Sequence, residues 1–271
     1  MDKNRVVKLF SECRIAGKKV LIPFLTAGYP DTKATAAMLS GLESRNIKIC
    51  ELGIPFSDPI ADGPTIQASY TAALEAHITL AEILETASGY RQNGGQMALL
   101  AMVSYTMVFR RGVAQFCQVL HDAGFDGIVV PDLPIEESGE LTKISGSINL
   151  CSVALISPTT PPKRQIELAE NSSGFVYFMS VAGITGERKI LPDSTFQAVE
   201  ELKKHTDIPI CIGFGISEPA MVKQAADASD GAIVGSAIIH RINDGLAAGV
   251  SNEKIVQDVC DFCSELLEPI Q

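Results

Sequence analysis

The segment Ile47-Lys-Ile-Cys-Glu51-Leu-Gly-Ile-Pro-Phe-Ser-Asp58-Pro-Ile-Ala-Asp62-Gly-Pro64 joins a short apolar run to a stiff loop. The apolar run leads into Glu51, and the loop contains three prolines, which fix φ and remove amide donors. A loop that only connects two elements does not need carboxylates at the mouth of an apolar strand, whereas a site that moves protons does. Aspartate before proline or glycine often only caps a turn, and that interpretation stays open for Asp58 and Asp62. The segment favours a functional loop at a strand end.

On both sides of this segment, short apolar runs alternate with helical patterns along the whole chain. The runs are apolar or β-branched with little alternation, as expected of parallel strands that are covered on both faces. Regular units without a linker predict a single (β/α)8 TIM barrel, one domain over 1–271, rather than the alternative of a doubly wound open sheet. The expected strands are 20–26, 47–53, 97–103, 127–131, 150–156, 174–179, 208–213 and 231–234.

Helical patterns follow each of these strands, and a chain of 271 residues fits a barrel of typically about 250. Ser217, two places before Pro219, is expected to cap one of the helices. In this architecture chemistry collects at the carboxyl ends of the strands. The barrel helices are expected at 33–44, 80–92, 113–123, 136–144, 162–171, 194–205, 219–228 and 236–243, with extra helices in the second loop near 61–75 and at the termini, before the first strand and at 252–267.

Composition narrows the classes of function. The net charge of −10 argues against a nucleic-acid groove, because phosphate backbones select basic faces. No apolar run approaches the roughly 20 residues needed to span a bilayer, and the first residues do not form a signal peptide. Cys260 and Cys263 form a C-x-x-C inside a helical pattern, which favours core packing over a zinc site that would need further ligands. The seven scattered cysteines indicate a reducing, cytoplasmic location.

Glycine clusters follow the sixth, seventh and eighth expected strands: Gly183-Ile-Thr-Gly186, Gly213-Phe-Gly-Ile-Ser217 and Gly235-Ser236. The loops after strands 7 and 8 form the usual phosphate site of such barrels, because glycine lets the backbone approach an anion and a helix start donates amides. The second cluster is no dinucleotide fingerprint, since Glu218 stands where a third glycine belongs. Any one cluster fits an ordinary turn, but three at adjacent strand ends favour phosphate binding.

The chemistry available beside this phosphate end is limited. The four histidines fall in helical patterns away from the strand ends, which disfavours a metal-dependent aldolase and predicts no metal site. No lysine stands at a strand's carboxyl end, so a Schiff-base mechanism lacks its nucleophile. Strand-end carboxylates and Tyr177 remain, and they suggest acid–base catalysis on a phosphorylated small molecule without a cofactor. A satisfied structural role for those carboxylates is the alternative.

Over essentially its whole length the chain resembles the α subunit of tryptophan synthase. The loop that opens with Glu51 is very specific to that family, whereas the glycine motifs are shared with other phosphate-binding barrels. The motifs that carry the resemblance are Leu25-Thr-Ala-Gly28, Glu51-Leu-Gly-Ile-Pro-Phe-Ser-Asp-Pro-Ile-Ala-Asp-Gly-Pro-Thr-Ile-Gln67, Val130-Pro-Asp-Leu-Pro-Ile-Glu-Glu137, Ser157-Pro-Thr-Thr160, Gly174-Phe-Val-Tyr177, Gly183-Ile-Thr-Gly186 and Gly213-Phe-Gly-Ile-Ser217.

The resemblance implies retro-aldol cleavage of indole-3-glycerol phosphate to indole and glyceraldehyde 3-phosphate. Glu51 matches the acid–base glutamate of the family, and Asp62 matches the aspartate that accepts a hydrogen bond from the indole N–H. Tyr177 matches a tyrosine close to that glutamate. The other substrate positions implied are Phe24 and Thr26 at the indole, Thr185 in the sixth loop, and Gly186, Gly215, Gly235 and Ser236 at the phosphate.

The resemblance also implies a partner, a β subunit that carries pyridoxal phosphate and receives indole through a tunnel in an α2β2 complex. This chain itself would hold no cofactor. The loop after the third strand would join the contact, but Ser104-Tyr-Thr-Met107 stands where the family has an aromatic residue, any residue and then asparagine. In the second loop the implied contact residues are Pro55, Phe56, Asp58 and Pro59.

Two other functions remain open on the sequence. The altered third loop motivates a regulatory protein that activates a β subunit without catalysis of its own, although Glu51, Asp62 and Thr185 are intact. A different phosphate-binding barrel enzyme, such as a sugar-phosphate isomerase, would leave the proline-rich carboxylate loop without an explanation.

Overall fold

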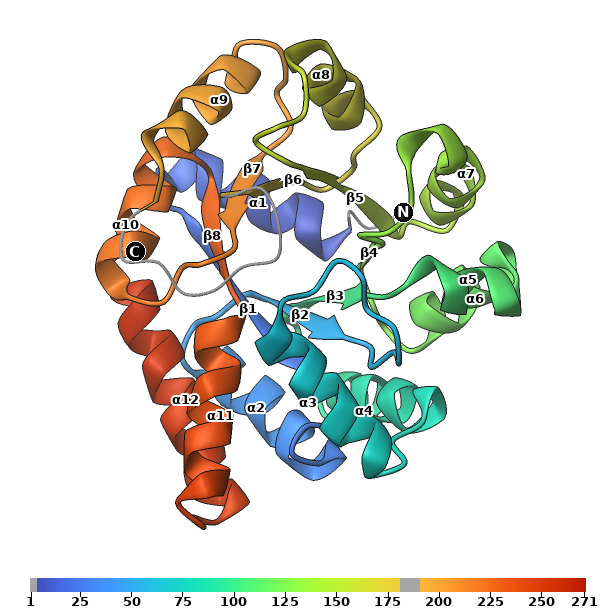
Figure 1. The fold of residues 1–271 in the computed structure, drawn as a ribbon, viewed down its shortest axis with the longest axis vertical. Helices are drawn as coiled ribbons and strands as arrows, with labels where there is room; N and C mark the ends of the chain where they lie inside the picture. Colours follow the sequence, from blue (N-terminus) through green and yellow to red (C-terminus); the bar gives the residue numbers. More distant parts are fainter. Residues whose placement is uncertain (1–3, 181–190) are drawn as a thin grey trace.

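A closed barrel of parallel strands forms the centre of the protein, and the computed structural model describes residues 4–180 and 191–271. Figure 1 looks onto the carboxyl ends of the strands. β1 pairs with both β2 and β8, which closes the ring. The predicted TIM barrel is therefore confirmed, and the open sheet is excluded. The strands are β1 Val20–Thr26, β2 Ile49–Gly53, β3 Ala98–Met102, β4 Gly127–Val129, β5 Cys151–Ile156, β6 Val176–Met179, β7 Ile210–Gly213 and β8 Gly231–Val234.

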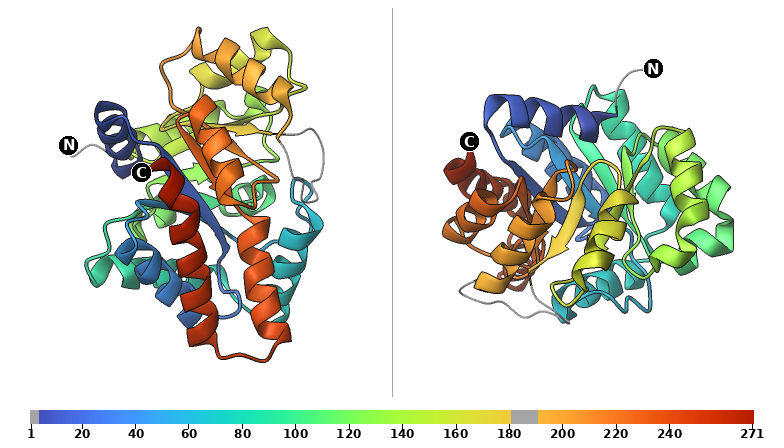
Figure 2. Two further views of the ribbon diagram at one scale, coloured as in Figure 1. Left: turned by 90° about the vertical axis from the view of Figure 1, so that its left-hand side faces the viewer. Right: turned by 90° about the horizontal axis from the view of Figure 1, so that it is seen from above.

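Helices surround the barrel, and α1 (Arg5–Ala16) crosses its amino-terminal end, behind the strands in Figure 1. Figure 2 shows the end of α12 (Asn252–Leu267) at that same end of the molecule. The predicted extra helices are therefore present before β1, after β2 and after β8. The remaining helices are α2 Thr32–Ser44, α3 Pro64–Glu75, α4 Leu80–Gln92, α5 Tyr105–Arg111, α6 Val113–Asp122, α7 Gly139–Ser147, α8 Pro162–Glu170, α9 Asp193–Lys203, α10 Pro219–Ala228 and α11 Ser236–Ala247.

Several local predictions were wrong. The sequence reading missed α5, a seven-residue helix that begins after Ser104, whose side chain accepts from the Thr106 amide. The helix expected from 136 is split, with a 3-10 turn at Ile135–Glu137 before α7. Ser217 does not cap α10, because Glu218 occupies the N-cap position. α3 begins at Pro64 rather than near 61, since proline fits a first helical turn and disfavours helix in the residue before it.

The core lies inside the barrel and between the barrel and its helices. All residues of β1, β2 and β3 are buried, which explains the lack of alternation in their sequences. Cys260 and Cys263 are buried in α12 and all seven cysteines are free, so the core role predicted for the C-x-x-C is confirmed. In the described part of the chain no helix is both long and apolar enough to cross a membrane.

A buried ion-pair network holds α1 against the amino-terminal end of the barrel. Asp126, directly before β4, accepts from Nη1 of Arg5 at 3.0 Å and from Nη2 of Arg91 at 2.8 Å. Its carboxylate also accepts from the Leu99 amide at 2.9 Å. The side chain of Asn4 donates to the Asp126 carbonyl, at 2.7 Å. These bonds tie α1, α4, β3 and β4 together below the strands.

Replacing Asp126 with alanine is expected to lower the free energy of unfolding by about 3 kcal/mol or more, because Arg91 then keeps a mostly buried charge without its partner. Urea unfolding measures this change. The matched control is Asp122→Ala at an exposed position, which is expected to change stability by no more than about 0.5 kcal/mol. Equal effects of the two substitutions would show that the network does not stabilise the fold.

Candidate active site

Glu51 lies in the middle of β2, paired with Phe24 of β1 and Leu100 of β3. Only 1% of the residue is exposed, and its Oε1 atom has no hydrogen-bond partner among the described residues. Burial, with a smaller contribution from the charge of Asp62, raises the pKa of Glu51 to about 8. A buried carboxyl with an unpartnered oxygen is not a satisfied structural group. Its raised pKa makes Glu51 a candidate proton donor at neutral pH.

Asp62 stands at the end of the loop that follows β2. Its carbonyl accepts from the side chain of Gln67 at 2.7 Å, which fastens the loop to α3. Gly63, not Asp62, is the N-cap of α3, so Asp62 does not cap that helix. Burial first, and then the charge of Asp132, raises the pKa of Asp62 to about 7.

Two tyrosines bring the carboxylates into one site. Tyr70 of α3 and Tyr177 of β6 are both buried. Burial, and then the charges of both Glu51 and Asp62, raises the pKa of each phenol. The charges of Glu51 in β2 and of Asp62 in the following loop therefore both reach two phenols. One phenol belongs to α3, and the other belongs to β6 on the opposite side of the barrel. Sequence reasoning found Tyr177 but missed Tyr70, which follows Ile66 at the four-residue spacing of a buried helix face.

Gly53, the last residue of β2, makes room for this aromatic group. A Cβ atom at Gly53 would lie 2.4 Å from Cζ of Phe24 and 2.4 Å from the Tyr70 hydroxyl oxygen. Both rings therefore pack directly over the backbone at the end of the strand. Phe24 is 3% exposed and sits beside Glu51 in the sheet register, where an indole-lining residue was expected.

Thr26 anchors α3 to the end of β1. Its hydroxyl lies 2.6 Å from the hydroxyl of Ser69, which also donates to the Ile66 carbonyl at 2.7 Å. Thr26 and Ser69 are both fully or almost fully buried. Because α3 carries Tyr70 and follows Asp62, this bond fixes one wall of the site. Ser69 is a further residue that the sequence reading missed.

The atypical segment after β3 holds a third carboxylate, which comes from the loop after β4. Asp132 accepts from the Ser104 hydroxyl at 2.7 Å and from the Tyr105 amide at 2.8 Å, so it holds the start of α5. Asp62, Tyr70, Ser104 and Asp132 are among the residues that line a small cavity, which occupies about 290 Å³ when the part open to solvent is included. The departure from the family pattern thus builds a fixed wall beside Asp62.

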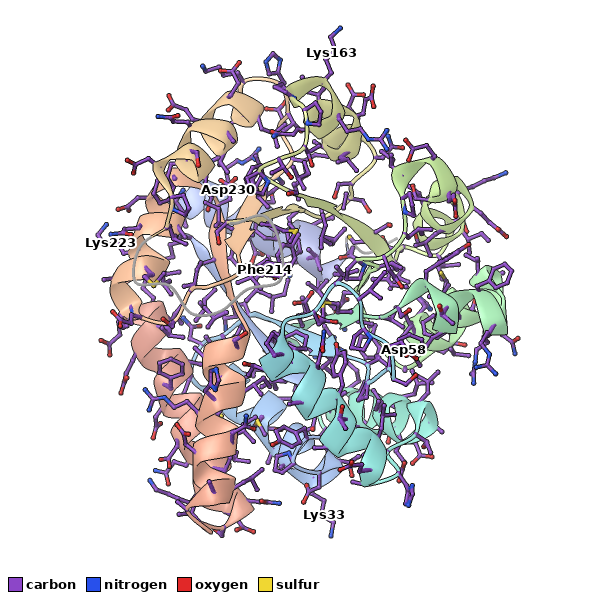
Figure 3. The ribbon with its side chains drawn as sticks, viewed as in Figure 1. Lys33, Asp58, Lys163, Phe214, Lys223 and Asp230 are labelled. Carbon is purple, nitrogen blue, oxygen red and sulfur yellow. The ribbon has the colours of Figure 1, made fainter. Side chains whose placement is uncertain are left out.

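The loop after β7 has the geometry of an anion site. Phe214 and Gly215 both have left-handed backbones, with φ of 76° and 74°. Such a conformation is costly for phenylalanine, and the Ser180 hydroxyl holds it by donating to the Phe214 carbonyl at 2.5 Å. A Cβ atom at Gly215 would meet nothing within 4 Å. Figure 3 shows Phe214 near the middle of the barrel end and Asp58 on a separate loop.

The start of α11 faces the same end of the barrel. Its N-cap is Gly235 and makes no side-chain cap bond, so Ser236 and the residues after it begin the helix without a side-chain acceptor. Helix starts of this kind bind phosphate through their amides and the helix dipole. Gly215 thus follows β7, and Gly235 and Ser236 follow the neighbouring strand β8, in the loops where the sequence placed them. Thr185 and Gly186 lie outside the described residues.

One histidine lies closer to this end than the sequence indicated. His240 of α11 contacts the Thr65 hydroxyl in the first turn of α3, at 3.2 Å from its Nε2 atom. The reading of all four histidines as remote from the strand ends was therefore wrong for His240. Within 4–180 and 191–271, no group of three or more histidine, cysteine, aspartate or glutamate side chains has the arrangement of a metal site.

The second loop also forms part of the surface at this end. Asp58 is exposed and accepts from the Ser57 hydroxyl at 2.5 Å, while Phe56 and Pro59 are half-buried. Pro55 is buried within the chain. Ile60, in the same loop, is 75% exposed, and Phe109 of α5 is 70% exposed. The carboxyl-end surface therefore presents apolar side chains from the second and third loops.

Comparison with known proteins gives a consistent family. The family model described as tryptophan synthase alpha chain matches residues 10–270. The tryptophan synthase alpha chain of Rhodopirellula baltica is 41% identical over 269 residues, 97% of each chain, and that of Thermoanaerobacter sp. (strain X514) is 39% identical, covering 98% of this chain and 99% of the relative.

Solved structures agree with these relatives. Tryptophan synthase subunit alpha from Legionella pneumophila str. Paris matches with a TM-score of 0.90 and 29% identity, covering 99% of each chain. A chain of Mycobacterium tuberculosis tryptophan synthase matches with a TM-score of 0.88 and 31% identity, again over 99% of each. The match extends along the whole barrel and includes the loops that carry Glu51 and Asp62. The chain belongs to the tryptophan synthase alpha chain family.

Proposed function

We propose that Glu51 and Asp62 carry out the reaction of this family, the cleavage of indole-3-glycerol phosphate to indole and glyceraldehyde 3-phosphate. The observation that supports these roles is the burial of Glu51 with one oxygen unpartnered, in a site that also contains Asp62. A sugar-phosphate isomerase would not need a second carboxyl beside an aromatic pocket. Retro-aldol release of indole does.

Glu51 acts first as an acid. Because its pKa is about 8, the carboxyl is mostly protonated at pH 7 and gives its proton to C3 of the indole ring. The C3–side-chain bond then breaks, and its electron pair restores the aromatic ring. The hydroxyl on the departing carbon loses its proton to the carboxylate of Glu51 and becomes the aldehyde of glyceraldehyde 3-phosphate. The cycle ends with Glu51 protonated, as it began.

Asp62 stabilises the charge that appears between these steps. Protonation at C3 puts a positive charge on the indole nitrogen, and an ionised Asp62 accepts the N–H hydrogen bond and offsets that charge. With a pKa of about 7, Asp62 is ionised in a large fraction of molecules at neutral pH. The two carboxyls thus have different roles, Glu51 as the acid and Asp62 as the anion, because their environments give them different pKa values.

The remaining predicted residues bind the two ends of the substrate. Phe24 packs against the indole beside Glu51, and Tyr177 covers the ring from β6. Thr26 contributes by holding α3. The phosphate binds to backbone amides at the opposite side of the barrel end, supported by the left-handed turn at Gly215 and the uncapped start of α11. The phosphate residues proposed are Gly186, Gly215, Gly235 and Ser236, with Thr185 closing over the substrate.

The alpha chain of this family carries no cofactor and pairs with a β subunit that holds pyridoxal phosphate. Phe56, Asp58 and Pro59 of the second loop, with Pro55 beneath them, are proposed as the contact, in an α2β2 assembly that passes indole onward. The exposed Ile60 and Phe109 support an interface there. Seven free cysteines support the reducing cytoplasm as the location. One continuous hydrophobic core supports a single domain over 1–271.

Replacing Glu51 with glutamine is expected to lower kcat for indole formation by about 10²–10⁴ or more, because the amide cannot give or take the proton. Glutamine has the same shape, so folding and β-subunit binding are expected to be unchanged. Indole release by the isolated chain, with and without a β subunit, measures the effect. The matched control is Glu85→Gln, at an exposed position of α4, which is expected to keep full activity. Full activity of Glu51→Gln would refute the assignment.

The pH dependence of kcat/KM is expected to be bell-shaped. Activity rises as Asp62 ionises near pH 7 and falls as Glu51 loses its proton near pH 8, with the apparent values belonging to the coupled pair. Asp132→Asn removes a negative charge that raises the pKa of Asp62, so the acid limb is expected to move to lower pH. The alkaline limb, set by burial of Glu51, serves as the internal control. An acid limb that stays in place or moves to higher pH would contradict this coupling.

A further inference from the structure

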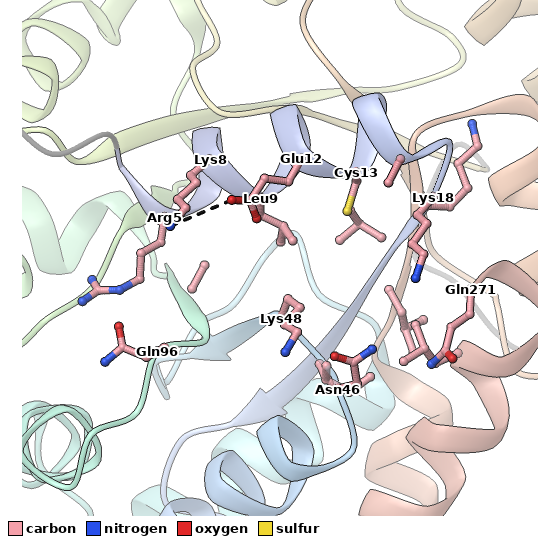
Figure 4. A pocket seen from close by; sticks show the side chains of 17 residues that line it. Arg5, Lys8, Leu9, Glu12, Cys13, Lys18, Asn46, Lys48, Gln96 and Gln271 are labelled. Carbon is pink, nitrogen blue, oxygen red and sulfur yellow. Dashed lines mark ion pairs between the residues drawn. The ribbon is translucent and has the colours of Figure 1, made fainter.

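A second cavity lies at the amino-terminal end of the barrel, opposite the active site. It occupies about 1350 Å³, including the part open to solvent, between α1, the starts of β1 and β2, and the C-terminal residues. The pocket beside Asp62 occupies about 290 Å³. Figure 4 shows Asn46 and Lys48 extending from the start of β2 into the space beneath α1. The family's reaction takes place at the other end, so this cavity has no role in it.

The lining of this cavity is strongly basic in a chain whose net charge is −10. Its cationic side chains outnumber its acidic ones, even when a carboxylate at Gln271 is counted with Glu12. Such an imbalance inside a concave surface raises the local concentration of anions. The cationic lining residues are Arg5, Lys8, Lys18, Lys19 and Lys48.

Three of these cations already have partners. Arg5 pairs with Asp126, Lys8 lies 3.9 Å from Glu12, and Lys19 donates to the Ser229 carbonyl at 2.5 Å. Lys18 and Lys48 are exposed and form no ion pair with any described residue. They come from different elements, the turn before β1 and the start of β2. The cavity therefore has two lysine side chains without an ion-pair partner among the described residues, at different parts of its lining.

The floor of the cavity is apolar. Leu21 and Ile47 are buried at the strand starts, and Leu9 of α1 forms the facing wall. An apolar floor with a few convergent polar groups is the usual composition of a small-molecule site. Inorganic phosphate would bind the cationic side chains but would leave the apolar floor in contact with water. A neutral hydrophobic molecule would cover the floor but would leave both ammonium groups without an anionic partner.

We propose that this cavity binds an amphipathic organic anion, a compact apolar body with one carboxylate, sulfonate or phosphate group. The apolar body lies along the partly exposed Leu9 of α1, above the buried Leu21 and Ile47, and the anionic group pairs with Lys18 or Lys48. The site is separate from the phosphate end of the barrel, because the two occupy opposite ends of the strands.

The probe is 8-anilinonaphthalene-1-sulfonate, an aromatic sulfonate whose fluorescence reports an apolar environment. The full chain is titrated with its active site filled by a non-reactive indole-alkyl phosphate. We expect one saturable site, and at least tenfold weaker binding to Lys18→Glu/Lys48→Glu. The matched control is Lys33→Glu/Lys163→Glu, the same charge change at the exposed positions labelled in Figure 3, which is expected to bind as the original chain does.

A second pair of measurements separates charge from hydrophobicity and from the catalytic site. The uncharged analogue N-phenyl-1-naphthylamine is expected to bind at least tenfold more weakly than the sulfonate. Lys18→Met/Lys48→Met, which keeps the apolar stems, is expected to bind the sulfonate weakly and to retain the original circular dichroism spectrum. Glu51→Gln is expected to bind it normally. Equal binding by the Lys18/Lys48 and Lys33/Lys163 variants, or displacement of the sulfonate by the indole-alkyl phosphate, would overturn the proposal.

Discussion

Burial of the Glu51 carboxyl, with no partner for Oε1 in residues 4–180 and 191–271, is the constraint on which the rest of the site depends. Water and hydrogen bonds normally stabilise the charged form of a carboxylate, and their loss favours the protonated form at neutral pH. Neither a salt bridge nor a cap explains a glutamate in the middle of a parallel strand. The barrel tolerates it because one neutral carboxyl costs far less to bury than an ion, and in the proposed reaction that carboxyl supplies the proton.

The surroundings of Glu51 are built from elements far apart in sequence. β1 supplies Phe24, β6 supplies Tyr177, and α3 supplies Tyr70 through the bond between Ser69 and Thr26. Asp132 links this group to α5 and at the same time raises the pKa of Asp62. Ser104 of the third loop, which differs from the family pattern, thus holds the carboxylate whose charge raises the pKa of Asp62, one of the two residues proposed for catalysis.

Much of this was predictable from the sequence. The predicted bounds of β1 and β8 are the same as those in the structure, because uninterrupted apolar runs mark buried parallel strands. Glu51 and Asp62 were identified by the proline-rich loop that follows the second strand. α5 was missed because seven residues are too few for a clear helical period, and its anchor, Asp132, is 28 residues from Ser104. The sequence also missed Tyr70, Ser69 and His240, because their partners lie far away in the sequence. Those contacts depend on how α3 packs on the barrel, not on neighbouring residues.

The most direct measurement is a ¹³C NMR titration of glutamate carboxyl groups in the unliganded chain, with Glu51→Gln used to assign the resonance. The Glu51 carboxyl is expected to be protonated at pH 7 and to titrate near pH 8. Asp62→Asn removes the charge of Asp62, which raises the pKa of Glu51 less than burial does. The substitution should therefore lower the pKa of Glu51 only in part. A Glu51 carboxyl that is already ionised at pH 5, as in an exposed glutamate, would contradict the account.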